Sequence, residues 1–573
     1  MKDEAKATSM LFQETGKFII IGLTGRTGSG CSTVSRILSE KNFKVPPTSR
    51  IYQNENDKRK YGIVLNYIGV NWRPFIAIQV RAIITGVLLR LKYEEFVSFV
   101  SDVMGSDISE PNKRLSGIEE EYKKAHKIVT DFNHLSDEDE KEREEKKEKG
   151  LNLYLDFLPE FCDKLKDFLK DNLSAKAYTI LYQRVGDNIR ASGTANSSEF
   201  NENKLFTIPK IIWHLVKAIK LKNQIKGACI TIDAIRNPFE AIYFQQRYSN
   251  FYLISINTPD EIRIDHLRKE HQLSDQQINE LDSKEYPEKL VGKDIYVSQN
   301  IQKCIEIADI HINNPVRDNY DNELRSQLAW YISLIIHPGL ITPTSNERCM
   351  QLAYTAKLNS GCISRQVGAV VTDSNYSVKA VGWNSSPEGQ VPCILRNAKE
   401  LLCGGDEVVY SKYERNDKNF QVVANKSYGL IIEHDNLKGR NVSYCFKDLQ
   451  NKVDDEKNQV HTRSLHAEEN AFLQIAKYGG PGIHGGVLFS TASPCELCSK
   501  KAYQLGIKKI VYIDPYPGIS KNHILSVGDK APEMILFSGA IGYAYHKLYQ
   551  SVMAYKDELK MLTGLTIQRS DNR

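Results

Sequence analysis

The chain has 573 residues, of which 41% are hydrophobic and 26% charged, and its formal net charge is +5. This length predicts two or three domains of ordinary soluble composition, and the small charge argues against a dedicated nucleic-acid binder. No signal peptide and no apolar run near the ~20 residues of a membrane span are recognisable, and the 11 cysteines are irregularly spaced, so we expect a cytoplasmic protein with no disulfide framework and no membrane partner.

Near the N-terminus the sequence predicts a buried strand followed by a glycine-rich turn. The strand covers Lys17–Leu23, which is almost entirely apolar. The turn contains Gly25, Gly28 and Gly30, and a helix is expected from Val34 onward. A strand, a glycine-rich turn and a helix in this order are typical of a P-loop, whose backbone N–H groups surround a phosphate.

The match to the P-loop pattern G-x-x-x-x-G-K-[ST] is partial. Ser32 fills its position and, with Thr33 beside it, can reach Mg²⁺, but Cys31 stands where the pattern has lysine. That lysine normally steadies the β- and γ-phosphates. We therefore expect a nucleotide, with Mg²⁺ as a candidate companion, and not phosphoryl transfer. The alternative is a glycine turn that only allows close packing of strand and helix.

Two later strands favour the same kind of domain. Gly227–Ile232 is apolar and is followed by Asp233, an acid at a strand end, where ligands collect in open α/β sheets. Phe251–Ile256 is another strand, and the helix after it carries Arg263 and Arg268. This order of elements resembles that of nucleoside and nucleotide kinases. The two arginines either face a phosphate or lie on a solvated helix face.

The first domain is expected to end near residue 320. The charged run Asp137–Lys149 predicts a protruding helix or a mobile insertion within it. Ala308–Asn314 reads as its closing strand, and Pro315–Asn319 as the boundary. We expect a P-loop kinase-like domain with a parallel sheet over residues 15–320 and a second domain over residues 321–573.

Two short motifs in the second domain carry chemistry: His466-Ala467-Glu468 and Pro494-Cys495-Glu496-Leu497-Cys498. Together they match the H-x-E…P-C-x-x-C signature of zinc-dependent nucleobase deaminases. His466, Cys495 and Cys498 offer one nitrogen and two thiolates to Zn²⁺ and leave a fourth position for water, whose pKa the ion lowers. Glu468 is placed to move protons. A purely structural zinc is the alternative, but such sites have four ligands and need no adjacent acid.

The elements around these motifs predict a three-layer α/β/α domain. From about Asn346 the order is helix, strand, strand, helix, strand, helix, strand. The strand at Gly486–Ala492 runs into Pro494, which suits the first turn of a helix. Cys495 and Cys498 then lie one turn apart at a helix N-terminus, which favours their ionised form.

Over about Glu347–Tyr516 the second domain resembles the deoxycytidylate (dCMP) deaminases. Four motifs in order carry the resemblance: Cys362–Val371, Gly382–Gly389, His466–Ala471 and Gly506–Tyr512. It implies conversion of dCMP, dCTP or both to deoxyuridine nucleotides, with Zn²⁺ as cofactor, in a homo-oligomer. It also implies that Asn384 contacts the sugar or the base and that Ala467 is a substrate contact. Val367 is expected to shape the pocket wall with Gly368 and Ala369, and Tyr516, just beyond a sheet strand, is a candidate to stack on the pyrimidine.

A P-loop domain placed ahead of such a deaminase is similar to a bacterial anti-phage family. That resemblance implies that the enzyme drains the deoxycytidine nucleotide pool during infection, while the P-loop domain binds a regulatory nucleotide or RNA and gates the deaminase. Three other functions stay open. They are a cytosine deaminase acting on single-stranded nucleic acid, a nucleotide kinase with a structural zinc module, and a nucleotide sensor without turnover.

The deaminase motifs are interrupted by an insertion from Gln390 to His461. It contains Cys393, Cys403 and Cys445 and ends at His461. These residues either hold a second, structural zinc, as in some dCMP deaminases, or are scattered thiols under a loop. The insertion itself is a candidate substrate lid or oligomer contact.

Overall fold

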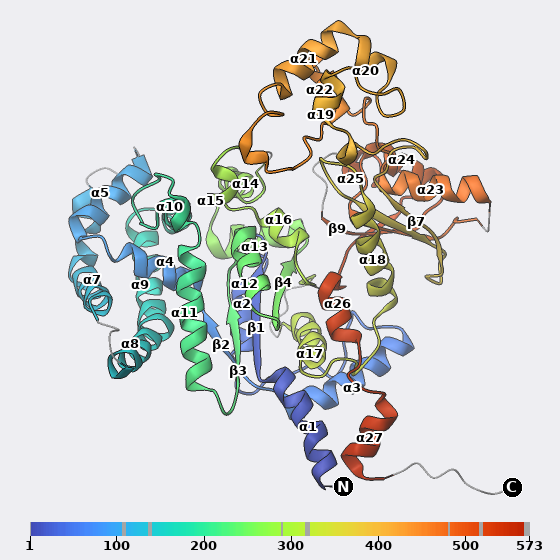
Figure 1. The fold of residues 1–573 in the computed structure, drawn as a ribbon. Helices are drawn as coiled ribbons and strands as arrows, with labels where there is room; N and C mark the ends of the chain where they lie inside the picture. Colours follow the sequence, from blue (N-terminus) through green and yellow to red (C-terminus); the bar gives the residue numbers. More distant parts are fainter. Residues whose placement is uncertain are drawn as a thin grey trace, which may run out of the picture. The chain divides into compact units, whose positions relative to one another are not determined.

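The computed structural model describes residues 2–105, 111–135, 140–287, 290–315, 321–479, 482–514 and 520–565 (Figure 1). The chain forms two compact units. Unit 1 combines Met1–Thr342 with Tyr543–Arg573, and unit 2 is Pro343–Gly542. Each unit contains a β-sheet with helices packed on it, so the predicted mixed α/β class is confirmed.

The sheet of unit 1 is parallel, with its strands in the order β5, β4, β1, β3, β2. Their bounds are β1 Phe18–Thr24, β2 Phe75–Ile78, β3 Ala228–Ile232, β4 Phe251–Asn257 and β5 Ile310–Asn313. Every residue of β3 and β4 is buried, which explains why both strands are continuous apolar runs. Four strands lie where the sequence predicts them. The short strand β2 was not predicted.

The helices of unit 1 lie around this sheet and in a helical region between β2 and β3. They are α1 Lys2–Gly16, α2 Cys31–Leu38, α3 Glu55–Asn71, α4 Val80–Leu88, α5 Tyr93–Met104, α6 Pro111–Leu115, α7 Glu119–Asn133, α8 Glu140–Asn152, α9 Leu158–Asn172, α10 Ala177–Ser192, α11 Thr207–Lys222, α12 Pro238–Arg247, α13 Asp260–His271, α14 Asp275–Glu285, α15 Asp294–Val297, α16 Ile301–Glu306, α17 Asn322–Ile336, α26 Gly542–Tyr549 and α27 Tyr555–Thr563. The described part of the charged run, from Glu140 to Lys149, lies in α8, and its described side chains are mostly exposed.

The division between the units differs from the predicted boundary after residue 320. Nearly every side chain of α17 is buried, and this helix packs on α3 and β5. At the other end of the chain α27 packs on α1. Residues 321–342 and the C-terminal helices therefore belong to unit 1, where α17 and α27 pack.

Unit 2 is the three-layer α/β/α unit that the sequence predicts. Its sheet has the order β10, β9, β8, β6, β7. Ala369 and Val371 on one face of β6 pack in the same core as Ala467 of α23. Val370 on the opposite face packs with Met350 of α18. This alternation buries both faces of the sheet, one under α23 and the other under α18.

The bounds in unit 2 are α18 Ser345–Ala356, β6 Gly368–Thr372, β7 Val378–Trp383, α19 Ala398–Leu402, α20 Lys412–Asn416, α21 Lys418–Tyr428, α22 Phe446–Asp454, α23 Ala467–Tyr478, β8 Val487–Ala492, α24 Glu496–Gln504, β9 Lys509–Asp514, α25 Ser520–His523, β10 Glu533–Leu536 and β11 Gly539–Ala540. The insertion is a small helical subdomain made of α19–α22, seen together in Figure 1. Its own apolar core includes Tyr410, Phe420 and Tyr444, and a buried ion pair joins Arg396 to Glu414.

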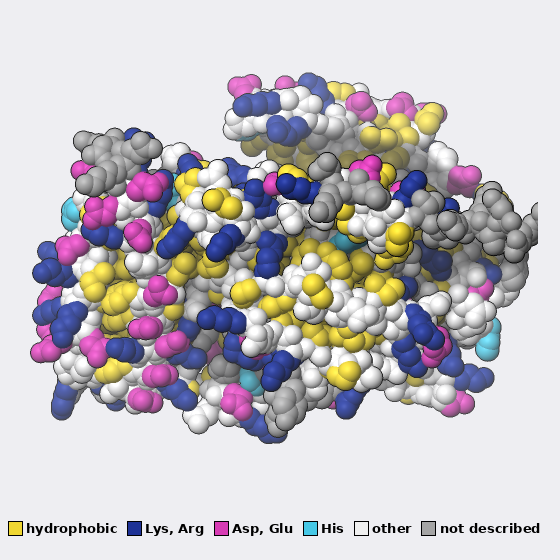
Figure 2. Space-filling view, turned by 90° about the horizontal axis from the view of Figure 1, so that it is seen from below, with side chains coloured by type: hydrophobic (Ala, Val, Ile, Leu, Met, Phe, Trp, Pro, Cys, Tyr) yellow, Lys and Arg dark blue, Asp and Glu magenta, His cyan; other side chains and the backbone are white. Residues whose placement is uncertain are grey.

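The surface agrees with the small net charge. On the face shown in Figure 2, lysine and arginine side chains are interspersed with aspartate and glutamate side chains. None of the described helices combines the length and apolar character needed to cross a lipid bilayer.

Candidate active site

Two helix N-termini in unit 2 bring the predicted zinc ligands together. His466 is the N-cap of α23, and Cys495 is the N-cap of α24, which follows β8 after a short turn. Helix α24 begins at Glu496, two residues later than Pro494 suggested, so Cys498 lies in its first turn. The backbone N–H groups at both termini face the ligands and favour negative charge there.

The three ligand atoms lie at distances that suit one Zn²⁺ ion. They all lie within 4.8 Å of one another. The Nδ1 atom of His466 is 3.2 Å from Sγ of Cys495 and 3.5 Å from Sγ of Cys498. Ideal tetrahedral zinc bonds place nitrogen and sulfur ligands ~3.5 Å apart. Within the described residues this is the one group of three such side chains close enough to hold a metal.

The protonation states of these groups are linked. The pKa of Cys495 is lowered to about 3, because the Cys498 thiol and His466 hydrogen-bond to its thiolate. The pKa of Cys498 is raised, first because its thiol is bonded to Cys495 and second because it is buried. The hydrogen bond to Cys495 likewise raises the pKa of His466. One thiolate is thus already favoured, and a bound cation would displace the remaining protons.

Glu468 lies beside the ligands without being one of them. Its side chain is 4% exposed, and Ser490 of β8 donates a hydrogen bond to its Oε1 over 2.8 Å. Burial raises the pKa of Glu468. The neighbouring Glu469 has a different role, since it pairs with Lys501 and caps the His466 N–H over 3.4 Å. Only Glu468 of these two acids lines the cavity described next.

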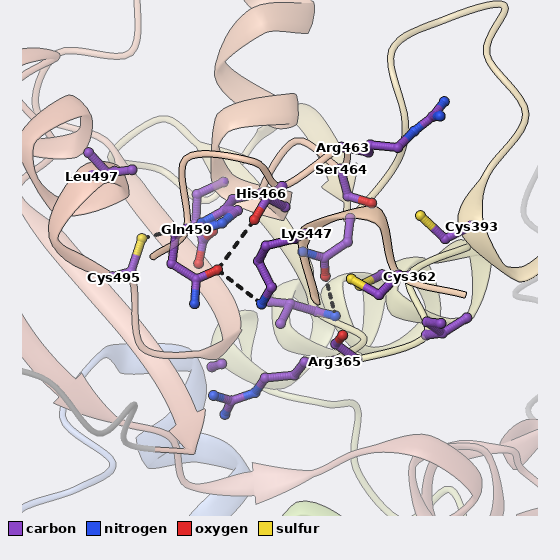
Figure 3. A pocket seen from close by; sticks show the side chains of 18 of the residues that line it. Cys362, Arg365, Cys393, Lys447, Gln459, Arg463, Ser464, His466, Cys495 and Leu497 are labelled. Carbon is purple, nitrogen blue, oxygen red and sulfur yellow. Dashed lines mark hydrogen bonds between the residues drawn. The ribbon is translucent and has the colours of Figure 1, made fainter. Parts of the chain in front are cut away.

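A cavity of about 470 Å³ opens over the ligand set. The deaminase-like core contributes Cys362, Ile363, Ser364, Arg365, Val367, Asn384, Thr462, Arg463, Ser464, His466, Glu468, Ala492, Ser493, Cys495, Glu496 and Leu497, and the insertion contributes Cys393, Cys445, Phe446, Lys447 and Gln459. Figure 3 shows Lys447 and Gln459 reaching into the same space as His466 and Cys495. The volume is within the range of small-molecule sites.

Two of the four predicted substrate-binding residues line the cavity. Asn384 and Val367 both line the cavity, and Oδ1 of Asn384 accepts the Val367 N–H at 2.6 Å. The Nδ2 group of Asn384 has no hydrogen-bond partner in the described part of the chain. The Ala467 side chain is fully buried in the core and does not line the cavity, because it faces the sheet. Tyr516 lies outside the described residues.

The insertion supplies side chains that sequence reasoning missed. Lys447 at the start of α22 and Gln459 after it enter the cavity, and their spacing from His466 gives no signal of this. Of the two alternatives for the insertion, the second zinc is not supported, because in the described part of the chain its candidate ligands do not come close enough together to hold a metal. Cys393 and Cys445 line the cavity and Cys403 is exposed, while His461 is 3.3 Å from Asp454. The thiols are scattered because the insertion folds around an apolar core.

The predicted P-loop residues of unit 1 form a tight turn between β1 and α2. Gly28 and Gly30 have φ values of 86° and 111°, which favour glycine. A Cβ atom on Gly25 would lie 2.5 Å from the carbonyl oxygen of Ile256. Ser32 and Asp233 line one cavity, and Asp233 accepts the Val80 N–H over 2.9 Å. Thr33 is half-buried beside Ser32 and does not line it.

The two arginines on α13 differ. Arg263 is 1% exposed, so it does not lie on a solvated face, and it pairs with Asp282 at 2.7 Å. It also donates to the P-loop carbonyl of Thr27 over 3.3 Å. Arg268 is half-exposed and pairs with Asp275. Only Arg263 therefore contacts the glycine-rich turn.

The comparisons with known proteins assign the family. The family model of the cytidine and deoxycytidylate deaminase zinc-binding region matches residues 343–514. The chain is 30% identical over 176 residues to the deoxycytidylate deaminase of Enterobacteria phage T2, across 29% of this chain and 78% of that protein. The chain belongs to the cytidine and deoxycytidylate deaminase family. The matched region of this family member contains His466, Glu468, Cys495 and Cys498.

Other deaminases are similar to this chain over about a third of its length. The deoxycytidylate deaminase of phage T4 is 30% identical over 29% of this chain and 76% of its own length. That of Schizosaccharomyces pombe is 25% identical over 32% of this chain and 41% of its own. The dCMP deaminase of cyanophage S-TIM5, solved with dCMP and dUMP, is 25% identical, and the match covers 34% of this chain and 99% of that one with a TM-score of 0.21.

Proposed function

We propose that this protein is a zinc-dependent deoxycytidylate deaminase that converts dCMP, dCTP or both to the deoxyuridine nucleotide and releases ammonia. The observation that carries the proposal is a cluster of three zinc-type ligands, two of which line one cavity together with the buried acid Glu468. The names of the curated relatives support the substrate class.

The chemistry requires one proton carrier beside the ligand set. His466, Cys495 and Cys498 would hold Zn²⁺, which would lower the pKa of a water molecule beside Glu468. Glu468 accepts a proton from that water, delivers it to the ring nitrogen next to C4 and assists the departure of ammonia. A C4–O bond forms and the C4–N bond breaks, so water and substrate balance the products without any oxidant.

Ser490 and Asn384 orient the reacting partners. Because Ser490 occupies one oxygen of Glu468, it fixes the carboxylate and leaves the other oxygen for the proton. Asn384 is fixed in the same manner, since its Oδ1 is bonded to the backbone of Val367. Its Nδ2 group is thereby directed to donate to the sugar or the base.

Lys447 is the cation that we assign to the substrate's 5′-phosphate. Its side chain is 17% exposed, and among the described residues its Nζ atom has two long contacts, 3.4 Å to Gln459 and 3.6 Å to Asp448. The other two cations of the cavity are engaged. Arg365 pairs with buried Asp514, and Arg463 lies 3.6 Å from Glu414 and donates to Gln390. A phosphate would give Lys447 the strong partner that it lacks.

The experiment is product analysis with full-length, zinc-loaded protein and four substrates: dCMP, dCTP, CTP and a cytosine-containing single-stranded oligonucleotide. Chromatography should detect deoxyuridine nucleotide from dCMP or dCTP. Product from the oligonucleotide alone would contradict the proposal and favour a nucleic-acid deaminase. Absence of product from every substrate would favour a sensor or a structural zinc module.

We also propose that the P-loop of unit 1 binds a regulatory nucleotide, and that the deaminase drains the deoxycytidine nucleotide pool of phage-infected cells. The turn geometry and the shared cavity of Ser32 and Asp233 support the first part. The resemblance of the fused domains to a bacterial anti-phage family supports the second. Nucleotide pools measured in infected cells with the wild type and with Glu468→Ala should differ in dCTP, and equal pools would contradict the defence role.

A further inference from the structure

Unit 1 contains a cavity of about 1120 Å³ beside the P-loop. Its wall includes the aromatic side chains of Phe75, Tyr178 and Tyr182. Gln299 also lines it, is 7% exposed, and its Oε1 atom has no hydrogen-bond partner in the described part of the chain. A buried, unpaired amide oxygen is costly unless a ligand or water completes it. The cavity thus has both the apolar surface and the unmet polar group of a ligand site.

The glycine-rich turn next to this cavity already holds an anion of the protein's own. The carboxylate of Glu285, the last residue of α14, accepts the backbone N–H of Thr27 at 3.0 and 3.2 Å. It also accepts the Thr27 hydroxyl and the Nη1 of Arg236, the latter at 2.6 Å. The Glu285 side chain is 0% exposed. Both Thr27 and Arg236 line the cavity.

This arrangement supplies what a bound phosphate would require. P-loops hold phosphate through backbone N–H groups, a hydroxyl and a cation. Here the N–H and hydroxyl come from Thr27, and the cation is Arg236, because Cys31 replaces the usual lysine. The Cys31 thiol is neutral, since burial raises its pKa to about 11. A carboxylate and a phosphate oxygen compete for the same donors.

A second set of ion pairs holds α14 over the turn. Asp282, one turn before Glu285, lies 2.6 Å from Arg26 of the turn and 2.7 Å from Arg263. Arg26 in turn pairs with Asp260 at 2.5 Å and lies against the ring of Tyr286. Removal of Glu285 from the turn therefore requires the end of α14 to move, together with the contacts of Asp282.

We propose that Glu285 is a built-in phosphate surrogate: the glycine-rich turn binds the phosphates of a nucleoside polyphosphate only when Glu285 leaves, and the nucleoside then occupies the adjacent cavity. This inference rests on the proposed nucleotide site of unit 1. It adds that the ligand must displace the Glu285 carboxylate, which occupies the glycine-rich turn in this structure.

The test is calorimetric binding of ATP and of inorganic tripolyphosphate, each with Mg²⁺, to the full-length, zinc-loaded protein. ATP is a purine ribonucleotide, whereas the proposed substrate is a deoxycytidine nucleotide, and a control incubation read by chromatography checks that ATP is not deaminated during the titration. Glu285→Gln should bind ATP at least about tenfold more tightly than the wild type, because a charged competitor for the donors is removed. Tripolyphosphate should gain similarly but bind more weakly than ATP, since it leaves the cavity unfilled.

Glu280→Gln is the matched control, because it makes the same charge change on the exposed face of α14. It should bind both probes as the wild type does. If Glu285→Gln misfolds, the wild type provides a second readout: hydrogen exchange of residues 275–285 should increase with saturating ATP.

Three outcomes overturn the inference. Equal affinities of the wild type and Glu285→Gln for ATP would show that Glu285 does not compete with phosphate, although the nucleotide site itself would still be supported. Equal affinities for ATP and tripolyphosphate would contradict the proposal that the nucleoside occupies the cavity. No binding of either probe to a Glu285→Gln protein that still melts cooperatively would overturn both the surrogate and the nucleotide site, and a parallel deamination assay keeps that failure separate from the deaminase proposal.

Discussion

Replacement of Lys447 by alanine tests how the insertion participates in substrate binding. We expect its Nζ atom to bind the 5′-phosphate of the substrate, since its contacts with Gln459 and Asp448 are long, at 3.4 and 3.6 Å. A hydrogen bond to a charged group is worth ~1.5–3 kcal/mol. With each ~1.4 kcal/mol equal to a factor of ten, Lys447→Ala should lower kcat/KM for dCMP by about 10- to 150-fold.

The discriminating assay compares dCMP with deoxycytidine, which has no phosphate. Initial rates of uracil-product formation should fall for dCMP in Lys447→Ala and change less than about threefold for deoxycytidine. Lys452→Ala is the control, because Lys452 is an exposed lysine of the same helix whose Nζ donates to Ser427 outside the cavity. Equal losses for dCMP and deoxycytidine, or no loss for dCMP, would refute the phosphate assignment.

Three further changes have defined outcomes. Ser490→Ala removes the 2.8 Å hydrogen bond to Glu468 and should lower kcat about tenfold with little change in KM. An unchanged kcat would mean that Ser490 contributes only to packing. Dialysis against a chelator should remove zinc, abolish deamination and lower Tm, and Zn²⁺ should restore all three; activity that persists without metal would count against the site. Burial raises the pKa of Asp309 to about 6, above the ~3.9 of an unfolded chain, so the folded state binds the extra proton between these values and loses stability as pH rises through them. Asp309→Asn should therefore increase the free energy of unfolding by up to about 3 kcal/mol at pH 7.5, seen as a higher Tm, and by much less at pH 5. A lower Tm of the variant at pH 7.5 would contradict this prediction.

The zinc ligands could be predicted because local structure determines their positions. Cys495 and Cys498 share one helical turn, and His466 and Glu468 share another, so short spacings carry the geometry. The fully buried strands β3, β4 and β8 were predictable for a similar reason, since buried strands are continuous apolar runs. The direction of the Ala467 side chain could not be predicted, because its position next to His466 does not reveal that this side chain faces the sheet.

The parts that could not be predicted depend on distant contacts. Lys447 reaches the cavity only because the insertion folds around its own core. Glu285 is 258 residues from Thr27 in sequence, and neither residue belongs to a pattern that names the other. The extent of unit 1 could not be predicted because α17 is buried in that unit and α27 returns from the far end of the chain to pack on α1.

The central claim is that Glu468 turns a zinc-binding cavity into a catalyst. The most direct measurement is single-turnover deamination of dCMP by Glu468→Gln beside the wild type, with zinc content and dCMP affinity determined on the same samples. The account predicts equal zinc, similar dCMP binding and a rate lowered by at least about 100-fold, within the range of general acid–base catalysis. Turnover at the wild-type rate in a zinc-loaded Glu468→Gln protein would contradict it.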